Sequence, residues 1–89
     1  MTRYRRNAAA TATEIDDGVF LVEPATQDIF YLDAIGSGLW RLLAAPQTLA
    51  QLQEVVREAF PEQPAAAVDA DVAAALDELV ARRLVLADP

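Results

Sequence analysis

The stretch from Asp28 to Leu43 places a strand directly before a helix, and this junction constrains the fold more than any other part of the chain. Residues 29–32 are apolar and mostly favour strands, whereas beyond Asp33 the large apolar residues recur every three or four positions. Asp33 is suited to cap the helix, because its carboxylate accepts from the free amides of the first turn and is favoured by the helix dipole. The sequence predicts a strand over 28–33 and a helix over 34–44 that ends before Pro46.

Two glycines, Gly36 and Gly38, fall inside this predicted helix. Each costs roughly 1 kcal/mol relative to alanine in a helix interior, so their presence indicates that another backbone packs closely there. A phosphate-binding loop would carry its glycines before the helix, and these lie within it. We therefore expect packing of the helix on the strand.

The residues before Asp28 predict two further strands. Residues 11–15 place β-branched residues at alternate positions, with Ala12 and Glu14 between them. Asp16–Gly18 supplies a turn in which Gly18 can take positive φ, and residues 19–22 favour a strand. Pro24 marks a second turn before the strand at 28–33. The result is a three-stranded antiparallel meander. We expect residues 1–9 to form a disordered tail and residues 10–86 a single domain.

Helical patterns dominate the rest of the chain. Thr48 and Gln51 form a capping box for a second helix that ends at Pro61, and a third helix begins between Pro64 and Asp69 and runs to Arg83. The apolar segment 84–86 could lie against the sheet. The predicted fold class is α+β, winged-helix-like, with a three-stranded antiparallel meander followed by three helices.

The residue types present leave few kinds of chemistry open. The chain has no Cys and no His, and all seven of its cations are Arg, which removes the commonest metal ligands, general base and Schiff-base nucleophile. The acidic pair Asp69 and Asp71 is explained by its place in the first turn of a helix, and Asp16–Gly18 by turn formation. We expect no enzyme activity, no cofactor and no bound metal.

The charge and hydropathy of the chain bear on its partners and location. A net charge of −7 disfavours nucleic acid, and the helix that would enter the DNA groove begins with two carboxylates. No stretch approaches the roughly 18 apolar residues of a membrane span. We expect a cytoplasmic protein that contacts neither nucleic acid nor membrane.

The strand at 28–33 is the last of the meander, so no later strand has to pair with its edge. If Phe30 and Leu32 face the helices, Ile29 and Tyr31 face the opposite way, which leaves an apolar edge strand. Such an edge is a liability unless it docks another chain. The alternatives are self-association of the edge, or its cover by residues 84–86.

The order of motifs along the chain resembles the PqqD-like family. The motifs are the following: Phe-Leu-Val-Glu-Pro (20–24), Ile-Phe-Tyr-Leu-Asp (29–33), Ile-Gly-x-Gly-Leu-Trp (35–40), Thr-Leu-x-x-Leu (48–52), Asp-Val-x-x-x-Leu-x-x-Leu (71–79) and Leu-Val (84–85). The resemblance covers roughly residues 12 to 86. The turn lacks the glycine usual in the family near Gln27, Asp33 replaces a more frequent Asn, and Arg83 stands where many relatives have Gly.

The resemblance implies a non-catalytic peptide chaperone of a pathway that makes ribosomally synthesised, post-translationally modified peptides. Such domains bind the leader of a precursor peptide as an added strand, in a cleft closed by the third helix, and present it to a radical-SAM protein, a protease or a cyclase. A homodimer that pairs through the same edge is the alternative. The implied peptide-binding residues are Gln27, Asp28, Ile29, Phe30, Tyr31, Leu32, Asp33, Val68, Val72, Ala75, Leu76 and Leu79.

Overall fold

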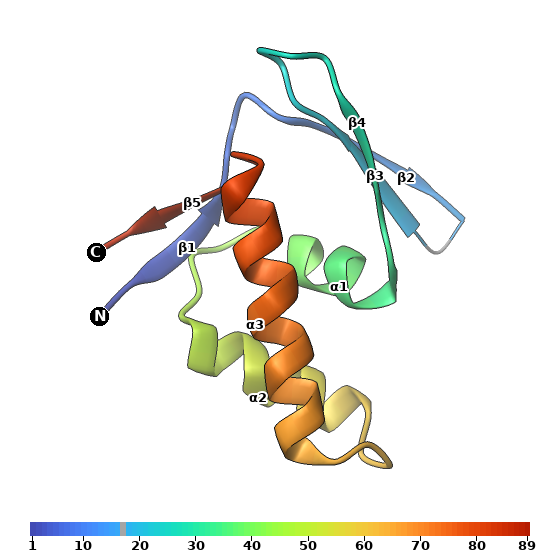
Figure 1. The fold of residues 1–89 in the computed structure, drawn as a ribbon, viewed down its shortest axis with the longest axis vertical. Coiled ribbons are helices and arrows are strands. Elements are labelled where there is room, and N and C mark those ends of the chain that lie inside the picture. Colours follow the sequence, from blue (N-terminus) through green and yellow to red (C-terminus); the bar gives the residue numbers. More distant parts are fainter. Residues whose placement is uncertain (17) are drawn as a thin grey trace.

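The computed structural model describes every residue of the chain except Asp17. Five strands and three helices follow one another along the described residues (Figure 1). Their bounds are β1 (Arg3–Arg6), β2 (Thr11–Ile15), β3 (Gly18–Val22), β4 (Ile29–Leu32), α1 (Ala34–Leu42), α2 (Leu49–Ala59), α3 (Ala65–Ala81) and β5 (Val85–Asp88). The prediction of an α+β fold, with an antiparallel meander before three helices, is confirmed.

The meander is the three-stranded sheet β2-β3-β4, with β3 in the middle. Both strand pairs are antiparallel, and Phe20 of β3 lies opposite Thr13 on one side and Tyr31 on the other. In the turn between β2 and β3, Asp16 takes positive φ (52°) and Gly18 already belongs to β3, so the expected role of Gly18 is wrong. The middle residue of the predicted turn, Asp17, lies outside the described residues.

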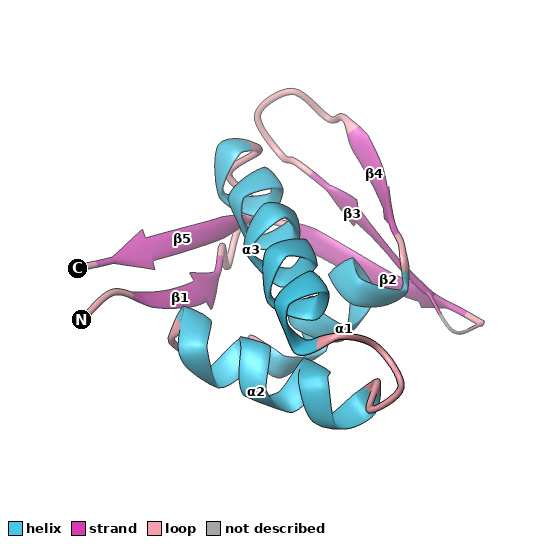
Figure 2. Ribbon diagram, turned by 60° about the horizontal axis from the view of Figure 1, so that its bottom comes forward, coloured by secondary structure: helices cyan, strands magenta, loops and turns pink. Residues whose placement is uncertain are grey.

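A second, two-stranded sheet joins the two ends of the chain. Strand β1 pairs antiparallel with β5, and both termini lie together on the side of α3 opposite the meander (Figures 1 and 2). The other edge of β1 is held at Tyr4, which exchanges two backbone hydrogen bonds with Gln47 (2.7 and 3.0 Å). The expectation of a disordered tail over residues 1–9 is therefore wrong, because residues 3–6 pair with residues 85–88 at the other end of the chain, and no local sequence pattern signals this pairing.

The pairing of β5 with β1 determines where the C-terminal segment, residues 84–86, lies. Leu84 and Val85 are fully buried in the core, but β5 joins β1 and not the meander. The edge of β4 is thus not covered by this segment.

The core fills the space between the meander, the three helices and β5. It is formed by large apolar side chains from every one of these elements: Val19, Leu21, Leu39, Trp40, Leu43, Leu52, Val56, Val68, Val72, Leu76, Leu79, Leu84 and Val85. The single tryptophan, Trp40, lies on the buried face of α1.

The strand-to-helix junction has the predicted cap and one of the predicted close contacts. Asp33 adopts an extended conformation and its carboxylate accepts from the Gly36 amide at 2.8 Å. A Cβ at Gly36 would lie 3.3 Å from Leu32 Cβ, so this glycine lets α1 turn tightly against the end of β4. At Gly38 no other atom comes within 4 Å of such a Cβ, and the expected close backbone is absent there.

Ser37 completes the junction between α1 and the sheet. The Val19 amide donates to Ser37 Oγ (3.1 Å), and Ser37 Oγ donates to the Leu32 carbonyl (3.3 Å). The hydroxyl is fully buried and bridges the ends of β3 and β4. It therefore fixes the position at which β4 leaves the sheet.

Replacement of Ser37 by alanine should lower the free energy of unfolding by about 1–3 kcal/mol, because a buried amide and a buried carbonyl lose their partner. Urea denaturation followed by circular dichroism measures this loss. Thr13→Ala, which removes an exposed hydroxyl from β2, is the matched control and should change stability little. Equal stability of the two variants would contradict the bridging role.

Candidate functional site

The outer edge of β4 is open, since no strand in the described part of the chain pairs with it. The Glu23 amide donates to the Asp28 carbonyl at 3.0 Å, and hydrogen-bonded pairs alternate along an antiparallel ladder. Following the register, Phe30 and Leu32 are the residues whose backbone groups face β3. The amides of Ile29 and Tyr31 consequently point outward from the sheet.

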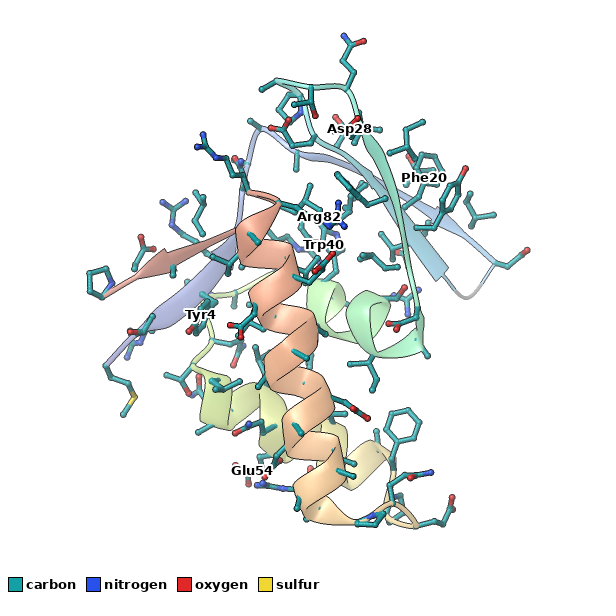
Figure 3. All side chains as sticks on the ribbon, viewed as in Figure 1. Tyr4, Phe20, Asp28, Trp40, Glu54 and Arg82 are labelled. Carbon is teal, nitrogen blue, oxygen red and sulfur yellow. The ribbon has the colours of Figure 1, made fainter. Side chains whose placement is uncertain are left out.

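The two faces of β4 differ in what they contact. Phe30 and Leu32 are half-buried and pack against the core, whereas Ile29 is 54% and Tyr31 78% exposed. On the outer face the ring of Tyr31 lies 5.7 Å from that of Phe20, which Figure 3 shows on the side of the sheet away from the helices. Phe30 and Leu32 therefore face the helices, and Ile29 and Tyr31 face the opposite way.

A groove runs between β4 and α3, and we call it the β4/α3 groove. Three cavities along it, of about 300, 160 and 420 Å³, are each lined from both sides. The β4 side is formed by Asp28, Phe30, Tyr31, Leu32 and Asp33, and the α3 side by Asp71, Ala74, Ala75, Glu78, Leu79 and Arg82. The α3 residues recur every three or four positions and so form one face of the helix.

The structure brings together only some of the residues expected on the α3 wall. Ala75 and Leu79 line the groove, and Val68 lines an adjoining cavity. Val72 and Leu76 are 0% and 1% exposed, belong to the core and line none of these cavities. The most apolar stripe of an amphipathic helix faces the core of the protein, and on α3 the face that borders the groove lies beside that stripe.

Sequence reasoning missed the polar members of the groove. Asp71, Glu78 and Arg82 share the helical face of Ala75, at spacings of three, four and seven residues. That spacing is the sequence signal that could have identified them. It is a weak signal, because charged side chains at regular helical spacing usually lie on the solvated surface.

One end of the groove is spanned by Arg82. Its guanidinium lies 4.4 Å from the centre of the Phe30 ring, and its Nε donates to Glu78 at 2.6 Å (Figure 3). The side chain therefore reaches from α3 to β4 and stacks on the inner face of the strand. A peptide at this end would contact a planar cation.

The turn before β4 is held by a buried carboxylate. Glu23 is 8% exposed, and its Oε2 accepts from the amide (2.8 Å) and the hydroxyl (2.9 Å) of Thr26. These bonds, led by the Thr26 amide, lower the pKa of Glu23, although its desolvation acts in the opposite direction. Gln27 takes positive φ (61°) in the same turn, without the glycine usual in the family, and Asp28 follows it.

The acidic residues considered as metal ligands have structural partners or lie apart. Asp69 forms an ion pair with Arg57 at 2.8 Å, and among the described residues no three acidic side chains gather as a metal site would require. None of the described helices has the length and hydropathy needed to cross a membrane.

One protein-family model matches most of the chain. The family model for coenzyme PQQ synthesis protein D (PqqD) matches residues 18–85. The structure of TbiB1 in complex with the TbiA(beta) leader peptide is similar, with a TM-score of 0.81, 26% sequence identity, and coverage of 91% of this chain and 93% of that chain. A search of curated proteins gives no match. The matched stretch takes in the whole of β3, β4 and the three helices, including both walls of the groove, and the chain belongs to the PqqD family.

Proposed function

We propose that this protein binds the leader segment of a ribosomally made precursor peptide, and that the leader adds as a strand to the outer edge of β4. The observation that carries the proposal is the open edge of β4, whose outward amides border a groove walled by α3. The similarity to TbiB1, solved with a leader peptide, supports a peptide as the partner.

The geometry of the groove suits an extended peptide. Its backbone would pair with the groups of Ile29 and Tyr31, and every second side chain would face α3. Ala74 and Ala75 leave room on that wall, while Leu32 and Leu79 supply apolar contact. Of the implied site, Gln27 to Asp33, Ala75 and Leu79 stay in the proposed contact set, and Asp71, Glu78 and Arg82 join it.

The protein has no catalytic role in this proposal. It holds the leader and presents the attached precursor to a modifying enzyme, such as a radical-SAM protein, a protease or a cyclase. The lining of the groove suits binding alone: it consists of carboxylates, two arginines, the hydroxyl residues Thr26 and Tyr31, and small or apolar residues. The Thr26 hydroxyl is already engaged in the turn before β4, where it donates to Glu23.

A homodimer paired through β4 is the second candidate, and the same open edge favours it. The two candidates exclude each other at the edge, because one strand edge accepts one partner strand. A leader peptide should then compete with self-association.

The test uses the leader segment of a precursor peptide encoded beside the gene, carrying a fluorescent label. Fluorescence anisotropy should show saturable binding by the full chain with a stoichiometry of one, and sedimentation velocity should show a monomer at saturation. A leader that fails to bind, together with a dimer whose stability is insensitive to it, would favour the second candidate.

A further inference from the structure

Beyond Leu32 the β4/α3 groove opens into a cavity of about 400 Å³, which we call the Asp71 pocket. It lies where α1 begins, α2 ends and α3 begins, and its walls include Asp33, Ile35, Phe60, Val68 and Asp71. The adjoining cavity of the groove shares Asp33, Ile35 and Asp71 with it. A strand added to β4 and extended past Leu32 would therefore reach this pocket.

The pocket combines apolar walls with carboxylates and no cation. Ile35 and Val68 pack against or belong to the core, and Phe60 is 40% exposed although it is a large aromatic. Asp33 gives one oxygen to its helix cap, whereas Asp71 makes no hydrogen bond or ion pair with the described residues. The nearby Asp69 differs, because Arg57 neutralises it.

We infer that the Asp71 pocket is a subsite for a lysine or arginine side chain of the docked peptide. This inference rests on the proposed strand addition at β4. The aliphatic stem of such a residue would cover Ile35 and Val68, and its charged head would meet the carboxylates of Asp33 and Asp71. The exposed Phe60 ring offers a further contact for a cation. An acidic side chain would be repelled, and an aliphatic one would cover the carboxylates without a counter-charge.

The register of the strand sets where the basic residue falls. Side chains that share the inner face with Phe30 and Leu32 alternate along the added strand, so the next inner position lies beyond Leu32, at the pocket. The peptide should thus carry a basic residue two positions from an apolar residue that packs beside Leu32. The basic residue follows the apolar one in a peptide that runs parallel to β4, and precedes it in a peptide that runs antiparallel to β4.

The test uses two capped synthetic peptides. In the first, Lys-Thr-Leu-Thr-Leu-Thr-Lys, a lysine reaches the pocket in either strand direction; in the second, norleucine replaces both lysines. Titration of the ¹⁵N-labelled full chain at low salt should show the lysine peptide binding about fivefold tighter, with shifts at the Asp71 and Phe60 amides. In Asp71→Asn the difference between the two affinities should shrink, because only the Asp33 carboxylate remains in the pocket. Glu54→Gln removes an exposed charge from α2, away from the pocket, and should keep the difference between the two affinities (Figure 3).

Each other outcome has a definite meaning. Equal affinities in the parent chain, or a difference that is undiminished in Asp71→Asn, overturn the cation subsite. Strand addition would still stand if both peptides shift the Ile29 and Tyr31 amides. Shifts confined to the pocket would keep the subsite and contradict strand addition. No shift with either peptide up to its solubility limit overturns the subsite.

Discussion

Replacement of Trp40 by alanine should lower the free energy of unfolding by about 3–5 kcal/mol, as large core truncations do. The indole is 5% exposed on the buried face of α1, and the Arg6 guanidinium lies 4.7 Å from the ring centre. Arg6 Nε also donates to the Trp40 carbonyl at 2.8 Å. The residue thus holds β1 against α1 as well as filling the core, and its loss loosens both.

Trp40 is the only tryptophan, so circular dichroism and not intrinsic fluorescence should follow the urea denaturation. Trp40→Phe keeps an aromatic ring in the core and should lose less stability than the alanine variant. Arg6→Ala should lower the free energy of unfolding only by the contribution of the stacking on Trp40 and of the hydrogen bond to its carbonyl. A Trp40→Ala variant that keeps parental stability and loses only peptide binding would show that the indole is a ligand platform.

Proline substitutions along β4 should distinguish the residues whose amides point outward from the residues whose amides bond to β3. Ile29→Pro and Tyr31→Pro should keep the fold, because their amides face away from β3 and proline is tolerated at such edge positions. Each should weaken leader binding by roughly 1 kcal/mol or more, the worth of a lost backbone hydrogen bond and its unpaired partner. Phe30→Pro should instead destabilise the fold, by about 3 kcal/mol, because it removes a ladder bond to β3 and the ring under Arg82.

The matched control is Tyr31→Ala, which removes the ring that packs on Phe20 and keeps the amide. Circular dichroism and urea denaturation report the fold, and anisotropy with the labelled leader reports binding. Folded Ile29→Pro and Tyr31→Pro variants that bind as tightly as the parent would contradict strand addition at this edge. A Phe30→Pro variant as stable as the parent would show that the Phe30 amide does not bond to β3.

The local elements of this fold could be predicted from the sequence because short-range chemistry determines them. The Asp33 cap and the Thr48/Gln51 capping box are satisfied within three residues, and both are present. The meander followed from alternating residues and turn chemistry in the same way, and the open edge of β4 followed from the order of strands. The motifs on these elements were also sufficient to identify the family.

Long-range pairing was decided only by the tertiary structure. Residues 3–6 carry three arginines and read as a solvated tail, yet they form a strand because β5 offers an edge and Trp40 offers a ring and a carbonyl to Arg6. The same pairing draws residues 85–88 away from the meander and leaves β4 uncovered. No local pattern encodes such a choice, since its free energy comes from partners that are distant in the sequence.

The groove face of α3 was likewise decided by packing. Two adjacent stripes run along α3 and its C-terminal end, one apolar and one carrying Asp71, Ala75, Glu78 and Arg82. Because burial of large side chains dominates the free energy of folding, Val72 and Leu76 turned to the core, and that rotation brought the polar stripe to β4. The sequence by itself determined the meander, the three helices and the open edge of β4, and tertiary packing determined which side chains lie opposite that edge.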